Sequence, residues 1–558
     1  DSSVLAVSGG YDAFRESMYR IREYLSLLLD ACFDETDASV MKAMLLGEKG
    51  TLDAELKEVY RANGIIHILA ISGLHLSVIG MGCHKLLRRM RIPYLVDIIL
   101  CAGLMYCYGI MTGMGTSMLR AYVMFVLHLL ADMIGRTYDL LTAVTVSAFI
   151  ILLQQPLYLL HSGFLFSFGA VCGIGILLPA AQQNLFGRSS AEKALLSGAA
   201  VSLSTLPVYL CFYYEFPPYS VLLNLIVIPC MTLVLLCGLA CLGLAACFLP
   251  LGETAAYPVH FLLWFYEKCC KVCLNLPGHT WTTGHPGLWQ VVLFFGILAG
   301  LVVWNGKIPR LLFWQGILCT MLVFGIRLPQ GLQITMLDVG QGDCIYLSEN
   351  DSMHMLIDGG SLDKSDVAAY QMLPYLKYEG TSSLDAVVVT HPDGDHISGI
   401  CAMLEEAAAG SGIAINVLYL PDVGEKGRNE EYHKLEELAA EAGTTVRYLS
   451  WGDRLQCGRV MLTCLHPEKG WDTDDSNAYS TVLHLSYGDF TALFTGDLEG
   501  EGERRVEKIV KEMNGSMSRG QNDPAVDGSI AYNDPEKPDL QDIILLKVAH
   551  HGSENSTS

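Results

Sequence analysis

Four side chains of the types that bind metal ions lie within six residues of the chain. His391, Asp393, Asp395 and His396 directly follow the apolar run 386–389, which predicts a buried strand. The end of this strand therefore delivers imidazole and carboxylate groups to one place, and such groups bind divalent metal ions. Polar residues that cap a following helix would explain Asp393 or Asp395 alone, but they do not explain the whole set.

Further imidazole and carboxylate groups follow other strand-like runs. They are His466, Asp497, and the adjacent His550 and His551. If these groups converge on one sheet edge, they hold two divalent ions with Asp497 as the bridge, and Asp395 and Asp497 are the predicted catalytic residues. Two such ions bind a phosphodiester, activate water and stabilise the leaving oxygen. Spacing does not decide which of His550 and His551 reaches the metal, and it leaves the role of His466 open.

Three other acidic residues stand at the ends of strand-like runs beside glycines: Asp338, Asp343 and Asp358. Their carboxylates can orient ligand histidines by accepting a hydrogen bond from the second ring nitrogen, or they can cap turns. The sequence favours neither role over the other.

The chain consists of an apolar half and an acidic half. Of its 558 residues, 51% are hydrophobic and only 17% are charged, whereas soluble domains average about 25% charged residues. Residues 1–330 carry a net charge of +1, and residues 331–558 carry −23. The 18 cysteines lie mostly inside apolar runs, where thiols act as small hydrophobic groups, so the sequence does not indicate a disulfide framework.

Apolar runs of the length that a bilayer requires, about 20 residues, fill the first half after a soluble helical segment at 1–60. We expect a membrane domain of about ten helical spans over 61–327. We expect an α/β domain over 328–558, with a polar loop insertion at 513–541. The expected spans lie near 65–83, 94–110, 114–131, 138–153, 160–180, 194–214, 219–248, 255–275, 288–304 and 309–326. The fourth is short, the seventh is over-long and the eighth carries three charged residues, so the count ranges from eight to eleven.

Basic residues in the short loops predict the orientation of these spans. Alternate loops contain either several basic residues or none. The basic ones are Lys85, Arg88, Arg89, Arg91, Arg136, Arg188, Lys193, Lys307 and Arg310. This bias places the basic loops in the cytoplasm and the carboxyl domain outside it, and an error of one in the span count would reverse the result.

Polar residues inside the apolar runs mark candidate channel positions. Ionisable groups at membrane depth are costly and normally face a bundle interior or a water path. His67 and His75 are eight residues apart, so on one helix they share a face, with Ser72 nearby. Arg120 is flanked by apolar residues on both sides, and we expect a functional role or a buried pair for it. Asn224, in the segment 224–229 that ends in proline, predicts either a broken helix that lines a cavity or plain helix packing.

The run from His391 to His396 resembles the motif of the metallo-β-lactamase superfamily, commonly His-x-His-x-Asp-His. Asp393 stands where the second histidine usually stands. Because a carboxylate is a harder ligand than an imidazole, this departure favours manganese or magnesium over zinc. The resemblance implies an αββα sandwich with two divalent ions, manganese or zinc, of which manganese is favoured.

The two halves together resemble the ComEC family of DNA-internalisation competence proteins. The resemblance rests on the segment from Gly64 to His75, on Arg120, on the segment 224–229 and on the segment 337–343. It implies an inner-membrane channel that imports one DNA strand, with an external nuclease domain proposed to degrade the other strand. The implied partners are DNA, the lipid bilayer and other DNA-uptake proteins, and a homo-oligomer is left open.

The sequence departs from the family pattern in several places. The family's Gly-Phe-Gln-Leu-Ser-Phe reads Gly-Phe-Leu-Phe-Ser-Phe at 163–168, and Ile400 replaces the second glycine after the metal motif. The family's oligonucleotide-binding domain is not recognisable. The chain lacks an initial methionine and stops shortly after His551, so we expect a sequence truncated at both ends.

Two other functions are compatible with parts of the pattern. A membrane-anchored, metal-dependent phosphodiesterase acting on cell-envelope polymers would explain the carboxyl half, but an anchor needs one or two spans and not about ten. A channel with a metal-free scaffold domain is the third possibility, and the completeness of the ligand set argues against it.

Overall fold

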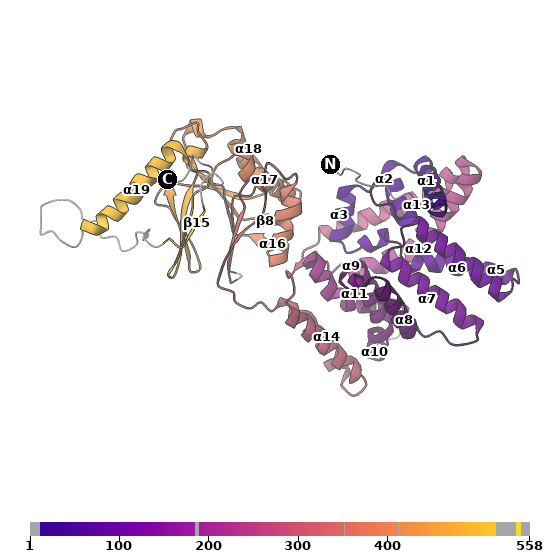
Figure 1. Cartoon of the computed structure of the whole chain (residues 1–558). Coiled ribbons are helices and arrows are strands. Elements are labelled where there is room, and N and C mark those ends of the chain that lie inside the picture. Colours follow the sequence, from indigo (N-terminus) through magenta and orange to yellow (C-terminus); the bar gives the residue numbers. More distant parts are fainter. Residues whose placement is uncertain (1–11, 185–188, 351, 411, 520–542, 548–558) are drawn as a thin grey trace. The chain divides into compact units, whose positions relative to one another are not determined.

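The computed structural model describes residues 12–184, 189–350, 352–410, 412–519 and 543–547. Backbone packing divides the chain into two units, Asp1–Gly325 and Ile326–Ser558. The first unit is helical and the second contains two β-sheets with helices (Figure 1). The change from helical to strand structure follows the change in hydrophobic period near residue 330.

The first unit begins with three helices, α1 (Ala13–Cys32), α2 (Glu35–Leu46) and α3 (Ala54–Ala62). The middle of the unit contains α4 (Gly73–His75), α5 (Met81–Arg89), α6 (Tyr94–Met111), α7 (Thr116–Met133), α8 (Leu140–Gln154), α9 (Ser162–Cys172), α10 (Leu178–Gln183) and α11 (Ser190–Tyr213). It ends with α12 (Ser220–Cys247), α13 (Leu249–Leu274), α14 (Leu288–Val303) and α15 (Arg310–Leu322). A small antiparallel pair, β1 (Glu215–Phe216) with β2 (Trp281–Thr282), lies between these helices in the chain.

Within the described residues, five helices are long and apolar enough to cross a membrane, judged by length and composition. They are Tyr94–Met111, Thr116–Met133, Ser162–Gln183, Glu192–Tyr213 and Ser220–Cys247, and each corresponds to a predicted span. Three further predicted spans correspond to shorter apolar helices, Leu140–Gln154, Leu288–Val303 and Arg310–Gly325. The first and eighth predicted spans do not meet the same criterion.

The first predicted span, 65–83, is not one helix. A 3₁₀ turn (η1, Ile66–Leu69) ends at Ala70, and a new helix starts after Ser72, whose hydroxyl accepts a hydrogen bond from the Leu74 amide. The seventh predicted span, by contrast, is α12, which continues through Pro229 without a break. The broken helix that Asn224 and Pro229 could indicate is therefore not formed.

The helical segment expected at 1–60 packs within the first unit. In α2, Met41, Met44 and Leu45 are buried in the same core as Val234 of α12 and Leu263 of α13. The charge that α2 carries into this core is neutralised, because Lys42 Nζ donates to Asp30 Oδ2 at 2.6 Å. Residues 35–46 therefore supply core side chains rather than a separate soluble segment.

The second unit contains two sheets. The first sheet has six strands, in the spatial order β10, β9, β7, β5, β4 and β3. Its strands are β3 (Leu332–Met336), β4 (Ile345–Glu349), β5 (Met353–Ile357), β7 (Ala386–Val388), β9 (Val417–Pro421) and β10 (Thr445–Leu449). The second sheet has the order β11 (Arg454–Cys457), β12 (Val460–His466), β13 (Val482–Tyr487), β14 (Phe490–Phe494) and β15 (Leu545–Lys547). A short parallel pair, β6 (Ser383–Leu384) with β8 (Ala414–Ile415), completes the unit.

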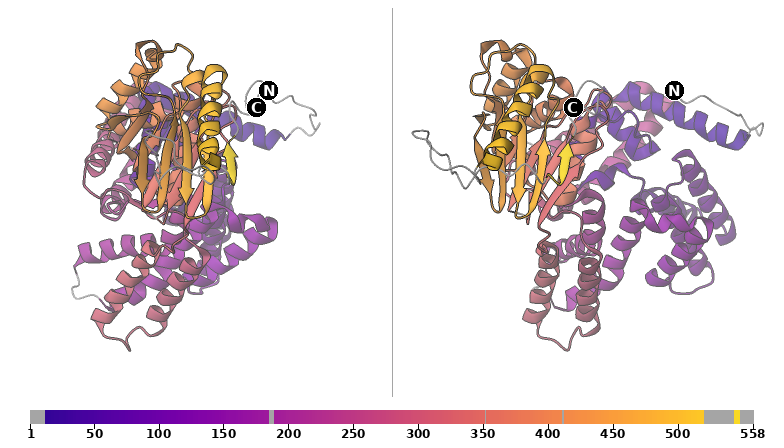
Figure 2. Two further views of the ribbon diagram at one scale, coloured as in Figure 1. Left: turned by 90° about the vertical axis from the view of Figure 1, so that its left-hand side faces the viewer. Right: turned by 60° about the vertical axis from the view of Figure 1, so that its left-hand side comes forward.

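Side chains alternate between the two faces of each strand, and this alternation builds a four-layer αββα sandwich. On β7, Val387 packs with helices α16 (Leu373–Glu379), α17 (Gly394–Ala408) and α18 (Glu430–Glu441), whereas Val388 packs against the second sheet. Val506 of α19 (Gly500–Arg519) packs on the outer face of the second sheet. The helices thus lie on opposite sides of the paired sheets (Figures 1 and 2). The predicted fold class is confirmed for both halves.

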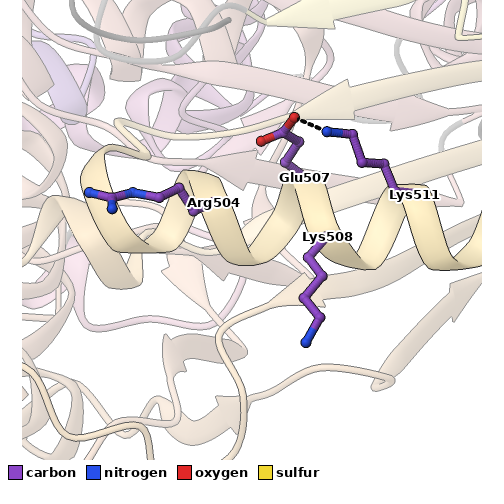
Figure 3. A pocket seen from close by; sticks show the side chains of 4 residues that line it. All are labelled: Arg504, Glu507, Lys508 and Lys511. Atoms are coloured by element: carbon purple, nitrogen blue, oxygen red, sulfur yellow. Dashed lines mark hydrogen bonds and ion pairs between the residues drawn. The ribbon is translucent and has the colours of Figure 1, made fainter.

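The exposed face of α19 carries a pocket of about 390 Å³ lined by Arg504, Glu507, Lys508 and Lys511 (Figure 3). Lys511 pairs with Glu507 one turn earlier. Because α19 extends to Arg519, the first seven residues of the loop predicted at 513–541 are helical. Residues 520–541 of that prediction lie outside the described part of the chain.

Candidate metal centre

Strand β7 and helix α17 place the metal-type residues between them. His391 comes three residues after the end of β7, and Asp393 is the residue that precedes the first turn of α17. His396 lies in that first turn and is fully buried, as is His391. A strand end followed at once by a helix start therefore turns both imidazoles toward the same interior point, with their ring centres 4.1 Å apart.

Three ligand-type atoms gather at this point. His396 Nε2 lies 3.4 Å from Asp497 Oδ2, and His391 offers a ring nitrogen within 4.8 Å of both groups. Asp497 follows β14 of the second sheet and is buried. The two sheets thus contribute metal-type side chains to one place, and His391, His396 and Asp497 form the candidate metal cluster.

Asp358 holds His396 in place from the other side. Its carboxylate accepts hydrogen bonds from the Thr390 amide and hydroxyl, both at 2.7 Å, and lies 3.0 Å from His396 Nδ1. The residue has a φ of +58°, an uncommon backbone conformation for a residue other than glycine. A carboxylate on the second ring nitrogen fixes the orientation of a ligand histidine, so the geometry gives Asp358 a positioning role rather than only a turn-capping one.

The hydroxyls of Thr390 and Ser480 fix the other histidine. Each oxygen lies 3.1 Å from His391 Nδ1. The Ser480 hydroxyl also accepts a hydrogen bond from the Asp497 amide at 3.2 Å. Ser480 therefore connects the two ligand loops, and the sequence analysis did not identify it because a serine near the start of a strand carries no distinctive signal.

Charge at the cluster shifts the protonation of its members. Burial would lower the pKa of His396, but the carboxylates of Asp358 and Asp497 outweigh burial and raise it to about 10. Burial would raise the pKa of Asp497, but its hydrogen bond with His396 and the charge of Lys547 hold it well below the usual range. Asp393, which accepts a hydrogen bond from Ser476, has a pKa raised by burial and by the nearby Asp395. His396 is therefore protonated and positively charged near neutral pH.

Lys547 is a functional candidate that the sequence analysis missed. Its ammonium group is buried, pairs with Asp343, lies 3.3 Å from Asp497 Oδ1 and donates to the Gly496 carbonyl at 2.8 Å. A lysine at the end of the apolar run 543–546, where β15 pairs with β14, was the available signal. A charge inside a strand that enters a core needs a partner, and here the partners are the acidic residues of the site.

The structure describes some of the other predicted site residues and not others. Asp343 groups with Asp358 and His396 within 4.8 Å. Asp395 contributes no atom to the metal-type groups found among the described residues, and its backbone carbonyl accepts a hydrogen bond from the Asp343 amide at 3.3 Å. Asp393 lies at the edge of the cluster, with Oδ2 3.6 Å from His391 Nε2. His550 and His551 lie outside the described residues.

Two predicted site residues lie away from the cluster. His466 is buried, with Nε2 2.9 Å from the carbonyl of Ala478 and its ring edge against Trp471. The side chain of Asp338 is 93% exposed and pairs with Lys364 at 3.2 Å. His466 supports the loop that carries Ala478, and its role as a metal ligand stays a prediction. Asp338 accepts a hydrogen bond from the Gly340 amide at 3.3 Å, so of the two roles left open by the sequence it takes the turn-capping one.

The donor set fits a divalent metal ion. Two imidazoles and a carboxylate converge within 4.8 Å of one another, and Asp358 and Ser480 hold these side chains in place. Imidazole and carboxylate are ligands of zinc, manganese and iron. The charge on His396 is compatible with this view, because a bound cation takes the place of a proton.

In the first unit, Arg120 of α7 lines a pocket of about 320 Å³ together with Ser77, His128 and Tyr138. Arg120 Nε donates to Ser167 Oγ at 2.7 Å, and no carboxylate among the described residues lies within ion-pair distance of it. The guanidinium is therefore available to an anion in the pocket.

The other candidate channel residues do not form one polar face. His67 is exposed in η1, whereas His75 is buried in α4, after the non-helical residues 70–72. His75 Nε2 lies 2.8 Å from the Met44 carbonyl, and His75 Nδ1 accepts from the Ser72 amide at 3.1 Å. These bonds give His75 and Ser72 a local structural role. The separation of eight residues does not place the histidines on one helix face, because the helix is interrupted between them.

Comparisons with known proteins agree with the two-unit structure. Residues 44–307 match the Competence protein family, and residues 337–557 match the metallo-beta-lactamase superfamily. The chain is 25% identical over 569 residues to ComE operon protein 3 of Bacillus subtilis (strain 168), covering 98% of this chain and 67% of that protein. It is 26% identical over 555 residues to Competence protein ComA of Neisseria gonorrhoeae, covering 93% and 67%.

Among solved structures, the metallo-beta-lactamase fold protein YhfI from Bacillus subtilis matches 30% of this chain and 62% of its own, at 17% identity and a TM-score of 0.22. The chain spans about two thirds of the length of the two curated relatives, which carry competence names. With a Competence domain followed by a metallo-β-lactamase domain, the chain belongs to the ComEC family of competence proteins.

Proposed function

We propose that this protein imports single-stranded DNA through the inner membrane during natural transformation, and that its αββα unit is a metal-dependent nuclease that degrades the strand left outside. The observation that carries the proposal is the joining of a competence-type helical unit to a unit that holds the His391, His396 and Asp497 cluster. In this proposal the protein lies in the cytoplasmic membrane and crosses it several times. The αββα unit lies outside the cytoplasm, as the basic loops predict.

His391, His396 and Asp497 are the residues that would hold a divalent ion, with Asp393 at the edge of the cluster. When bound, two such ions would supply a hydroxide near neutral pH and stabilise charge on the leaving oxygen. Manganese is favoured over zinc because the carboxylate of Asp393, in place of the family's second histidine, is a harder ligand than imidazole. Asp358 and Ser480 keep the imidazoles oriented, which preserves the ligand positions as substrate enters.

Because the second unit carries a strong negative charge, DNA can approach it only where basic side chains attract the phosphates. Residues 331–558 carry −23, and phosphate backbones are attracted by lysine and arginine. The basic side chains Arg504, Lys508 and Lys511 on the exposed face of α19 provide such a site (Figure 3). We assign these side chains to contact with the phosphate backbone of DNA, a role that carries no preference for a DNA sequence.

For passage through the helical unit, the proposal assigns Arg120 to contact with phosphate. Its guanidinium lines the pocket with Ser77 and His128, and its hydrogen bond to Ser167 leaves other N–H groups for a ligand. Further partners in this proposal are the lipid bilayer and other DNA-uptake proteins, with self-association as an additional possibility to measure.

Uptake of labelled DNA in cells that carry single variants tests the proposal. We expect Arg120→Leu to abolish import while leaving nuclease activity of the purified chain intact. We expect Asp497→Asn to abolish the nuclease activity, because it removes a carboxylate of the cluster. Arg136→Leu, a basic residue in a predicted cytoplasmic loop, is the matched control for loss of one positive charge in the first unit.

The nuclease assay uses the purified chain, residues 1–558, with single-stranded DNA. Activity is expected with added Mn²⁺ and none with chelator. Equal activity in chelator, or in the Asp497→Asn variant, would remove the assigned site. Cleavage of cell-envelope phosphodiester polymers with no action on DNA, together with unchanged uptake by Arg120→Leu cells, would support the membrane-anchored phosphodiesterase instead.

A further inference from the structure

A second cluster of metal-type side chains lies in the first unit, on a helical hairpin. His84 is on α5, and Asp97 and Cys101 are one turn apart on α6. His84 Nδ1 lies 2.8 Å from Asp97 Oδ2, and Cys101 Sγ donates to Asp97 Oδ1 at 3.3 Å. One ligand-type atom from each of the three residues lies within 4.8 Å of the other two.

The burial of this cluster calls for a positive charge. Asp97 and Cys101 are 0% exposed and His84 is 8% exposed, among apolar side chains that include Ile98, Met105 and Phe125. Among the described residues, no lysine or arginine pairs with Asp97. A buried carboxylate without a compensating partner is costly, so a cation is the expected companion.

The geometry favours a metal ion over a proton shared by His84 and Asp97. His84 Nδ1 and Asp97 Oδ2 face each other, yet neither atom is aligned for a hydrogen bond with a protein group. A metal ion that binds both atoms does not require the N–H···O alignment that a hydrogen bond requires. Ligand atoms at about 2.0–2.3 Å from a tetrahedral ion stand about 3–4 Å apart, which is close to the separations observed.

The α5–α6 hairpin holds these three donors in place. Cys83, next to His84 in the chain, packs against the same apolar core but contributes no atom to the group within 4.8 Å. The hairpin that carries these residues is tied at its turn: Arg88 Nη1 donates to the Ile92 carbonyl at 2.8 Å, and its guanidinium stacks over the Tyr94 ring. One sulfur, one nitrogen and one oxygen donor are therefore held on a fixed α5–α6 hairpin.

We propose that His84, Asp97 and Cys101 bind one zinc-class divalent ion that links α5 to α6. Sulfur and imidazole donors select a borderline-soft ion such as zinc. This site is separate from the candidate centre of the αββα unit, whose assigned ligands are histidine and aspartate without a thiol. The difference in donor atoms makes the two sites distinguishable by spectroscopy.

Cobalt substitution of the metal-stripped chain, residues 1–558, in detergent tests the proposal. Cobalt bound by cysteine thiolates gives a ligand-to-metal absorption band in the near ultraviolet that histidine and aspartate ligands do not give. We expect this band in the wild-type chain and its loss, with one cobalt fewer per chain, in Cys101→Ser and in Asp97→Asn. His396→Gln removes a ligand of the other site, so it is expected to keep the band.

Cys273→Ser is the matched cysteine control, because Cys273 belongs to the cluster of cysteines on α13 and not to this hairpin. It is expected to keep the band at full intensity. To separate folding from binding, added zinc is expected to raise the melting temperature of the stripped wild-type chain more than that of Asp97→Asn. A wild-type chain without the thiolate band, or a band unchanged in Cys101→Ser, would overturn the proposal.

Discussion

Lys547 determines the charge of the candidate metal centre in the absence of metal. Its ammonium group compensates Asp343 and Asp497, both of which lie at the cluster. A divalent ion bound at Asp497 would compensate the same carboxylate. The lysine and the metal therefore compete for one set of negative charges, and the relative strength of the two is measurable.

We predict that Lys547→Met destabilises the metal-free chain by about 3 kcal/mol, since breaking a buried ion pair leaves a carboxylate uncompensated. Saturating Mn²⁺ should restore more stability to this variant than to the wild type, because the ion replaces the lost charge. Melting temperatures in chelator and in Mn²⁺ measure both effects. Lys364→Met, which breaks the exposed pair with Asp338, is the control and should change little. Identical melting temperatures of the Lys547 variant and the wild type in chelator would contradict the prediction.

His396 makes the stability of the metal-free chain depend on pH. Its pKa is raised from 6.5 to about 10 in the folded chain, so the protonated form is stabilised by folding. This contribution is complete below pH 6.5 and is lost as the pH rises from 6.5 through about 10. We therefore expect unfolding in chelator to become easier between pH 6.5 and 9.5. His396→Gln should flatten this dependence, and equal slopes for variant and wild type would show that another group is responsible.

At the scale of elements, three loops meet through glycines to form the site. A Cβ atom on Gly360 would lie 2.5 Å from the Asp395 carbonyl carbon and 2.6 Å from the His396 amide nitrogen. Gly342, at a φ of +148°, packs against Gly360 and Asp395 in the same way. The close approach of these backbones brings the loop after β5 next to the first turn of α17, and so Asp358 next to His396.

Because backbone atoms cannot move aside as a side chain can, Gly360→Ala is expected to destabilise the chain by about 2–3 kcal/mol. It should also weaken Mn²⁺ binding, since it separates Asp358 from His396. Gly394→Ala is the matched control in the same region, where the added methyl meets only the end of Leu362 at 3.7 Å. Chemical denaturation and metal titration measure the two effects. A Gly360 variant as stable as the Gly394 variant would show that the loops can separate without cost.

The local hydrophobic pattern of the sequence predicted most helices, but it did not predict where helices are interrupted. Hydrophobic runs predicted α6, α7, α11 and α12, because burial and length leave few alternatives to a helix. Pro229 was compatible with a break, yet α12 continues through it. The break after η1 came instead from Ser72, whose hydroxyl starts a new helix. Serine is common inside helical runs as well as at helix starts, so neither outcome could be read from the residue alone.

At the scale of the molecule, the change from apolar to acidic composition near residue 330 predicted the two units. The His391 to His396 motif and Asp497 predicted part of the candidate centre, because these residues directly follow strands. Lys547 and Ser480 were not predicted, since their roles depend on pairing between β14 and β15 and on the approach of distant loops. His466 followed a strand in the same way but lies against Ala478, so strand position alone does not identify a ligand.

The uneven charge of the chain leads to a last prediction about DNA binding. With −23 on residues 331–558, this unit as a whole repels phosphate, and we assign the attraction to the basic groups on α19 and to any bound ions. If Arg504, Lys508 and Lys511 each neutralise one phosphate, the affinity for single-stranded DNA should fall with salt at a logarithmic slope of about −2. Replacing all three by glutamine should flatten the slope and weaken binding at low salt.

The matched control neutralises Lys377, Lys426 and Lys434, which lie on other elements, and should leave the slope unchanged. Binding of the whole 558-residue chain across a salt series, with catalysis suppressed by Asp497→Asn, measures these slopes. An unchanged slope in the α19 variant would exclude this helix as the phosphate contact, because counterion release depends on the phosphates that are actually neutralised.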